Sequence, residues 1–228
     1  RMEGNCKHTC LNFCINYLYM LFNINNSYFI CQTDLTMRKY DSSRRKMAAE
    51  QTRRDILQAA LKLHWKGITA YEPLAREAGC SVATLRKHFP SKENLFQNCT
   101  RAFAETLTMP DVAALSAITD SSQRIEQNVS ELCRIHEAMF GYAWLSAHQR
   151  DGSPTLDAEM QAYDGLADAI AGIITPADFP RAALVRGLLD FLSYRALRLS
   201  GRLSPTETKE ELVITLQQLI LQGSKSPA

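Results

Sequence analysis

The segment from residue 73 to residue 96, PLAREAGCSVATLRKHFPSKENLF, constrains the fold more than any other part of the chain. It indicates two short helices joined by a tight turn. Gly79 can end the first helix, because glycine adopts the left-handed conformation at a helix C-terminus without steric cost. Ser81 can cap the N-terminus of the second helix, which leaves residues 79–81 as the turn. The segment therefore predicts a helix-turn-helix unit.

The second of these helices has an apolar side and a polar side. Val82, Leu85 and Phe89 recur at helical spacing and are expected to be buried. The polar side carries small, hydroxyl and cationic side chains: Ala83, Thr84, Arg86, Lys87 and His88. Such a helix fits the major groove of DNA, because small residues allow close approach and Thr, Arg and Lys reach bases or phosphates. The alternative is an ordinary helical hairpin with a solvated basic face.

Helices are also expected on both sides of this unit. Residues 50–65 form an amphipathic helix that Gly67 stops, with Arg53, Arg54 and Lys62 on the side that faces water. A second helix follows from residue 69 or 70 to residue 78, which gives the head three helices up to Phe89.

A fourth helix is expected from Lys92 to about residue 107, with Ser91 as its N-cap. Lys92 lies beside the N-terminus of that helix, where backbone N–H groups and the helix dipole can hold a phosphate. A solvated surface lysine is the alternative interpretation.

The distribution of charge supports a polyanionic partner for the first part of the chain only. The 228 residues carry a net charge of +2, but residues 44–109 hold twelve cationic and six anionic side chains. Residues 110–228 hold ten cationic and fifteen anionic side chains. A basic first domain before an acidic second one is typical of nucleic-acid binding by the first.

A resemblance to TetR-type transcriptional regulators is carried by two segments, TRRDILQAALKL and LAREAGCSVATLRKHFPSKENLF. It covers about residues 50–97. It extends through the turn, the short helix after Ser81 and the SKE-x-L start of the fourth helix. Three departures stand out. Arg86 occupies a position where the family usually has Tyr, and His64 occupies the usual Phe position, with Trp65 expected to supply the missing bulk. The link before Leu74 is also shorter than usual.

The resemblance implies how the head meets DNA. Bases would be contacted by Val82, Thr84, and Arg86 or Lys87. Phosphates would be contacted by the remaining members of the set: Tyr71, Ser81, His88 and Lys92.

The second half of the chain is expected to be helical throughout, since no period-two alternation persists there. Five helices are predicted, over residues 110–118, 120–148, 153–174, 181–199 and 204–221. The fold class is therefore all-α, with an N-terminal three-helix helix-turn-helix DNA-binding head and a C-terminal helical ligand-binding and dimerisation domain.

The last two predicted helices are apolar around much of their circumference, so one face is available to a partner subunit. TetR-like proteins pair such helices into a four-helix dimer interface, and the resemblance implies the same here. The predicted interface residues are Leu184, Leu188, Phe191, Leu212, Leu216 and Leu219. The alternative is that both helices belong to the core of one subunit.

The middle helices carry aromatic and polar side chains that suit an effector pocket. His136, Phe140 and Trp144 fall on one face at successive intervals of four, and Tyr194 and Arg195 can approach from the penultimate helix. The predicted effector-binding residues are Cys133, His136, Phe140, Trp144, Tyr163 and Tyr194. Plain core packing, with His136 satisfied by a backbone carbonyl, is the alternative.

Residues 1–46 differ in composition from the rest, with no Ala and an excess of Asn, Ile, Tyr and Cys. The alternatives for this segment are a membrane helix over residues 11–30, a secretory signal, which lacks a cleavage site after the apolar run, and a metal site made of Cys6, His8, Cys10 and Cys14. The preferred interpretation is a non-native or disordered extension. On that interpretation Met47 is the natural start, residues 47–97 form the DNA-binding domain, and residues 98–228 form the effector-binding and dimerisation domain. A basic arm of Arg44, Arg45 and Lys46 could follow the DNA backbone.

These features predict a cytoplasmic, homodimeric, ligand-responsive regulator. It would act as a repressor that binds a palindromic double-stranded DNA operator and is released by a small-molecule effector. Cys80, Cys99 and Cys133 are scattered singly, which suits reduced thiols. No catalytic motif, cofactor loop or metal spacing occurs, so no enzyme activity, cofactor, metal or membrane partner is expected. The alternative function is an all-α small-molecule-binding protein without sequence-specific DNA binding.

Overall fold

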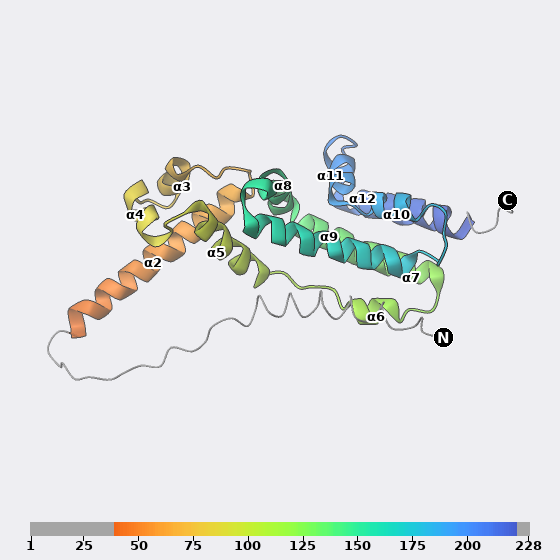
Figure 1. Ribbon diagram of the computed structural model, residues 1–228, viewed down its shortest axis with the longest axis horizontal. Helices are drawn as coiled ribbons and strands as arrows, with labels where there is room; N and C mark the ends of the chain where they lie inside the picture. Colours follow the sequence, from red (N-terminus) through yellow and green to blue (C-terminus); the bar gives the residue numbers. More distant parts are fainter. Residues whose placement is uncertain (1–38, 223–228) are drawn as a thin grey trace. The chain divides into compact units, whose positions relative to one another are not determined.

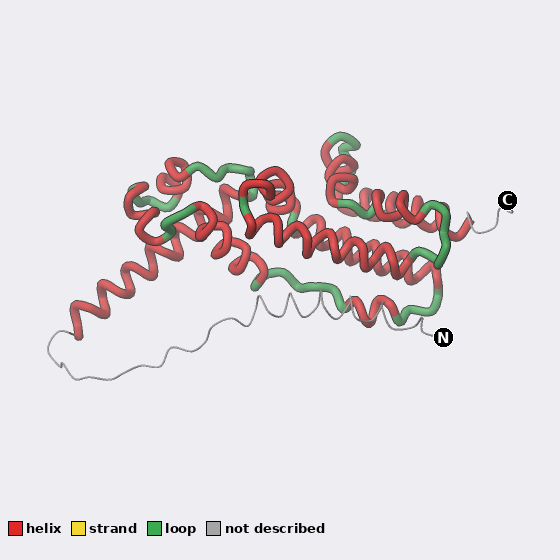
Figure 2. The backbone as a smooth tube through the Cα atoms, in the orientation of Figure 1, coloured by secondary structure: helices red, strands yellow, loops and turns green. Residues whose placement is uncertain are grey.

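The computed structural model describes residues 39–222, and within that range the chain consists of helices joined by turns and loops (Figures 1 and 2). The chain divides into two compact units, with the boundary between Phe103 and Ala104. The predicted all-α fold is confirmed. The segments weighed as a membrane helix and as a cysteine metal site lie outside the described residues.

Four helices build the described part of the first unit. They are α2 (Lys39–His64), α3 (Tyr71–Glu77), α4 (Val82–His88) and α5 (Lys92–Ala104). The first begins well before the expected residue 50, so the segment with Arg44, Arg45 and Lys46 is helical rather than a flexible arm. Strong helix formers such as Arg, Lys, Met and Ala fill residues 44–49, which accounts for the extension.

The turns of the first unit follow the sequence signals. Gly67 and Gly79 have φ values of 76° and 65°, in the left-handed region that stops α2 and α3. Ser81 accepts a hydrogen bond from the Thr84 N–H at 3.0 Å and caps α4 as predicted. The packed core between the four helices contains Ile56, Ala60, Leu74, Leu85, Phe89, Leu95 and Phe96.

The second unit contains seven α-helices in its described part, with a short 3₁₀ helix (Arg150–Gly152) before α9 and a π-helical turn (Gln218–Gln222) after α12. The α-helices are α6 (Val112–Ser116), α7 (Ser121–Ala138), α8 (Phe140–Gln149), α9 (Pro154–Ile174), α10 (Ala182–Leu188), α11 (Phe191–Leu199) and α12 (Pro205–Gln217).

In the second unit α7 packs against both α9 and α12, and α8 packs along α9. Fully buried side chains from these helices, among them Val129, Ile170 and Leu216, form its core. The start of α12 is a capping box, in which Ser204 and Glu207 exchange side-chain to backbone hydrogen bonds of 3.2 and 2.7 Å.

Two predicted helices are interrupted. The helix expected over residues 120–148 breaks at Met139, whose φ of −96° and ψ of 3° lie outside the helical range. Hydrogen bonds continue on each side, from the Met139 N–H to Ile135 O at 2.9 Å and from the Ala143 N–H to Met139 O at 2.7 Å. The break is therefore a local bend between α7 and α8, not a terminus in solvent.

The prediction of one continuous helix over residues 181–199 was also wrong, because two helices, α10 and α11, fill this range. Asp190 takes an extended conformation and its carboxylate accepts a hydrogen bond from the Leu192 N–H at 2.8 Å. It therefore caps α11 and separates that helix from α10, because an Asp side chain competes with the helix for backbone N–H groups. Within residues 39–222, no helix has the length and apolar character needed to cross a membrane.

Candidate nucleic-acid interface and effector cluster

The short helix α4 is anchored on one side and exposed on the other. Leu85 and Phe89 are fully buried, whereas Arg86 and Lys87 are exposed. Val82, in the first turn, is only half-buried. These positions give the apolar and polar sides that the spacing of residues predicts, and they leave the cations of α4 free to meet a ligand outside the unit.

The N-terminus of α4 is held in a fixed arrangement. The Ser81 hydroxyl accepts from the Thr84 N–H, and the hydroxyl oxygens of Ser81 and Thr84 are also hydrogen-bonded at 2.9 Å. Two hydroxyl groups are thus presented side by side at the edge of the helix that would approach a base pair. His88 is half-buried at the opposite end of α4.

The cations on this surface are unpaired within the described residues. No carboxylate there pairs with Arg86, Lys87 or Lys92, whereas Lys62 of α2 is paired with Glu77 of α3. Lys92 is exposed at the first position of α5, whose N-terminus is capped by Ser91 through a 3.0 Å hydrogen bond from the Asn94 N–H. These cations therefore have donors available for phosphates.

Tyr71 lies inside the first unit rather than on its surface. The side chain is 9% exposed, and its buried hydroxyl has no hydrogen-bond partner. Burial raises the pKa of Tyr71, and the nearby Arg86 offsets part of that rise. The Arg86 guanidinium lies 5.6 Å from the centre of the Tyr71 ring. A phosphate could reach the Tyr71 hydroxyl only after the side chain turned outward.

The contacts of Arg53 were not predicted from the sequence. Arg53, expected to face water, packs its guanidinium 5.1 Å from the Phe89 ring and donates a hydrogen bond to Asn98 of α5. This contact joins α2 to both α4 and α5. The partners are far apart in the sequence, so no local pattern could have predicted them.

His64 itself fills the position expected to need bulk from Trp65. The His64 ring is 1% exposed and packs 5.3 Å from the Phe96 ring, while Trp65 is 41% exposed. Neither ring nitrogen of His64 has a hydrogen-bond partner. Burial therefore lowers the pKa of His64 to about 4, since the charged form has nothing to compensate its lost hydration.

The predicted effector residues of the second unit gather around one buried histidine. His136 is 2% exposed, and its Nε2–H donates to the Leu189 carbonyl at 3.1 Å. Its Nδ1 then accepts from the Tyr163 hydroxyl. Burial lowers the pKa of His136 to about 4, so the ring is neutral at pH 7. Burial also raises the pKa of the Cys133 thiol to about 12.

Aromatic rings extend this cluster toward solvent. The Tyr194 ring lies 5.1 Å from His136 and 6.4 Å from Phe140, measured between ring centres. The Tyr194 hydroxyl donates to Glu137 at 2.7 Å. Phe140 and Trp144 are half-buried, and the Arg195 guanidinium lies over both rings. The structure therefore brings five of the six predicted residues together through ring contacts or hydrogen bonds, with Trp144 joined to the others through Arg195. The sixth residue, Cys133, is buried on the same helix as His136.

Comparison with known proteins identifies the head. Residues 56–99 match the family model of bacterial regulatory proteins of the tetR family, which spans the end of α2 through α5. Residues 56–99 are thus similar to the DNA-binding head of tetR-family regulators. The matched segment includes α4 with its exposed cations.

Comparisons over the whole chain are weaker. No curated protein matches it. A transcriptional regulator from Rhodococcus sp. RHA1 is 24% identical, with 77% of this chain and 96% of that chain covered and a TM-score of 0.49. A TetR transcriptional regulator from the same organism is 20% identical, with 75% and 95% covered and a TM-score of 0.39.

The predicted interface residues of the last helices fall into two groups by their exposure. Phe191, Leu212 and Leu216 are at most 4% exposed within the unit, so they contribute to its core. Leu184 is 51% exposed, and Leu188 and Leu219 are half-buried. Three further apolar side chains are about half exposed on the same helices: Leu192, Leu199 and Ile214.

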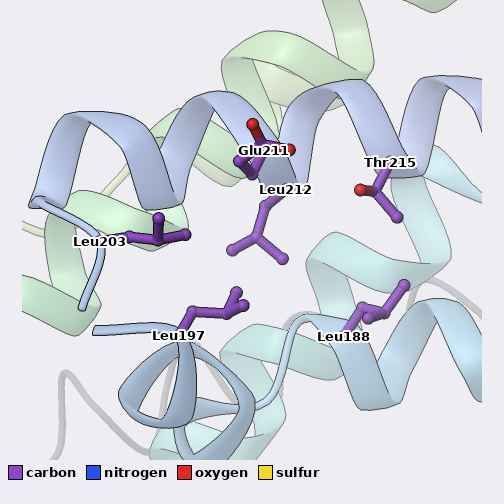
Figure 3. A pocket seen from close by; sticks show the side chains of 6 residues that line it. All are labelled: Leu188, Leu197, Leu203, Glu211, Leu212 and Thr215. Carbon is purple, nitrogen blue, oxygen red and sulfur yellow. The ribbon is translucent and has the colours of Figure 1, made fainter. Parts of the chain in front are cut away.

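A hollow of about 290 Å³ lies among α10, α11 and α12 (Figure 3). Figure 3 shows Leu188, Leu197, Leu203 and Leu212 pointing toward its centre, with Glu211 and Thr215 at its edge. The same helices therefore carry exposed leucines and an apolar depression. In the part of the chain that the structure describes, no group of three or more His, Cys, Asp or Glu residues is placed to hold a metal ion.

Proposed function

We propose that this TetR-family regulator binds a palindromic operator as a homodimer and acts as a repressor released by a small-molecule effector. The observation that carries the proposal is the exposed side of α4, where unpaired Arg86 and Lys87 lie beside the paired hydroxyls of Ser81 and Thr84. Val82, Thr84 and one of the two cations would contact bases in the major groove. Ser81, His88 and Lys92 would contact phosphates.

A dimer is proposed because one short helix contacts too few base pairs to select a site. Two heads presented about 34–36 Å apart would contact successive turns on one side of the duplex, and a two-fold axis would make the operator palindromic. The exposed side chains Leu184, Leu192, Leu199 and Ile214 on α10, α11 and α12 support an interface on these helices. Burial of such leucines against a second copy is favourable by the hydrophobic effect.

Release by an effector is proposed from the aromatic cluster around His136. Its rings connect α7, α8, α9 and α11, and its hydrogen bond to Leu189 reaches the junction of α10 and α11. A molecule that inserted among these rings would move the helices proposed to form the dimer. Operator affinity can change only by the difference between the effector's affinities for the two arrangements.

A mobility-shift titration on DNA flanking the protein's own gene tests the proposal. We expect binding that tolerates excess random DNA and weakens steeply as salt is raised, because cations that contact phosphates release bound counterions. Competition by random DNA that is as effective as competition by the flanking DNA would refute the operator. Such a result would favour the small-molecule-binding alternative.

A further inference from the structure

Arg195 of α11 differs from the other half-buried arginines of the second unit. Arg150, Arg186 and Arg198 each pair with a carboxylate, and Arg124 donates to a backbone carbonyl at 3.1 Å. Within residues 39–222, Arg195 has neither kind of partner. A half-buried cation without an anion is uncommon, because burial removes hydration that a partner normally replaces.

Two aromatic rings hold Arg195 in place. Its guanidinium carbon lies 4.1 Å from the centre of the Trp144 ring and 5.0 Å from the centre of the Phe140 ring. The ring faces attract the positive charge but accept no conventional hydrogen bond, so the N–H donors of the guanidinium remain available. Burial lowers the pKa of Arg195, which agrees with a cation that lacks an anionic neighbour.

Glu137, a carboxylate that contacts Tyr194 of this cluster, is already bound to other groups. Glu137 accepts from Arg198 at 3.0 Å and from the Tyr194 hydroxyl at 2.7 Å. Arg198 also lies 5.8 Å from the Phe140 ring, but its charge is balanced by Glu137. The positive charge of Arg195 is therefore uncompensated on a surface made of aromatic rings.

We propose that Arg195, Trp144 and Phe140, hereafter the Arg195 cradle, bind a small organic acid with a flat apolar body, of which an aromatic carboxylate is the simplest example. The planar guanidinium matches a carboxylate with two parallel N–H donors, and the rings supply apolar contact for the body of the ligand. The inference rests on the proposed effector response and names the chemical class of the effector. A neutral ligand of the same shape would leave the cation unpaired.

Tryptophan fluorescence tests the cradle directly. The chain has two tryptophans, so Trp65→Phe makes Trp144 the only source of tryptophan emission. The full chain with this substitution is titrated with benzoate, phenylacetate and 3-phenylpropionate, and separately with the three matching amides. We expect at least one of the three acids to give a saturable change in Trp144 emission at ligand concentrations below about 10 mM. This limit allows for dissociation constants on the order of 1 mM, as expected for fragments. The matching amide should give no change in Trp144 emission.

Variants assign the effect to the guanidinium. Arg195→Gln should weaken acid binding by about tenfold or more, as expected for a lost charge-assisted hydrogen bond. The acid affinity of Arg195→Lys should fall between those of the parent chain and Arg195→Gln, because lysine keeps the charge without the planar guanidinium. The matched control is Arg181→Gln, which removes an exposed arginine at the start of α10 and should leave the titration unchanged.

Several outcomes would overturn the inference. These are an equal response to acid and amide, unchanged binding in Arg195→Gln, or no response to any of the three acids. Conversion of dimer to monomer by Arg195→Gln without acid binding would show instead that a carboxylate of a second copy covers the cradle. Because this titration contains no DNA, its failure leaves operator binding intact, and acid binding by a chain that never selects DNA would refute only the proposed function.

Discussion

The guanidinium of Arg86 lies 5.6 Å from the centre of the Tyr71 ring. A cation on the exposed side of α4 therefore makes a cation–π contact with the first residue of α3. By the resemblance of this head to TetR-type regulators, Arg86 stands where those proteins usually carry a tyrosine. The contact restricts where the guanidinium can lie before DNA arrives. It also gives Tyr71 a role that depends on its ring and not on its hydroxyl.

Substitutions at Tyr71 separate these two roles. Tyr71→Phe keeps the ring and removes a buried hydroxyl without a partner, so operator affinity should be unchanged and stability equal or higher. Tyr71→Leu removes the cation–π contact and should weaken operator binding by about 0.5–1 kcal/mol, roughly two- to fivefold. Fluorescence anisotropy measures both. A clear loss in Tyr71→Phe would mean that the hydroxyl turns outward to a phosphate.

Thr84→Ala and Lys92→Ala should weaken DNA binding in different ways. Thr84→Ala should relax selectivity at one base-pair position by about 1–3 kcal/mol, whereas Lys92→Ala should weaken binding to all duplexes alike and lower the salt slope by about 1. Lys66→Ala, at an exposed position after α2, serves as the control. Equal losses on operator and random DNA for Thr84→Ala would contradict base contact by that side chain.

The stability of the head should fall in mild acid because of His64. Burial lowers its folded pKa to about 4 from 6.5, so the unfolded chain takes up the proton first as the pH falls. The stabilisation is complete above about pH 6.5 and is lost between pH 6.5 and 4, by about 3 kcal/mol. Urea unfolding at several pH values, followed by Trp65 emission in a Trp144→Phe background, measures this dependence.

His64→Phe is the matched variant for the acid effect. It keeps an aromatic ring against Phe96 and removes two ring nitrogens without partners, so the head should be more stable and its pH dependence flatter. An unchanged slope between pH 6.5 and 4 would show that another group governs acid unfolding. His136 has a similarly lowered pKa in the second unit, where Trp65 emission does not report directly.

Charged substitutions of exposed leucines should separate the proposed dimer. Leu184→Glu and Leu192→Glu each place a charge at a position about half exposed in the subunit, so the monomer should stay folded while association is lost. Met109→Glu, 40% exposed and outside α10, α11 and α12, should remain dimeric. Sedimentation velocity distinguishes the species. A dimer that survives both leucine substitutions would place the interface elsewhere.

Local signals predicted the parts of the fold that depend on neighbouring residues. The turn at Gly79 and the cap at Ser81 each involve groups within a few positions of one another. The break at Asp190 was hidden because the leucines around it keep helical spacing, and a capping aspartate looks like any polar position within such a run.

Contacts between distant residues could not be predicted in the same way. Arg53 was assigned to solvent because its own helix places it on the polar side, yet Phe89 and Asn98 cover it from later helices. The effector candidates were found from aromatic spacing. Their hydrogen bonds, and the unpaired state of Arg195, depend on how α7, α9 and α11 pack.

Selection of bound sequences from random duplexes tests the central claim most directly. The full chain is mixed with the pool at moderate salt, and the bound DNA is recovered and sequenced over successive rounds. We predict enrichment of an inverted repeat whose half-site centres lie about one helical turn, 10–10.5 base pairs, apart. A pool that stays random, or one that enriches a single half-site without its inverted copy, would contradict the account.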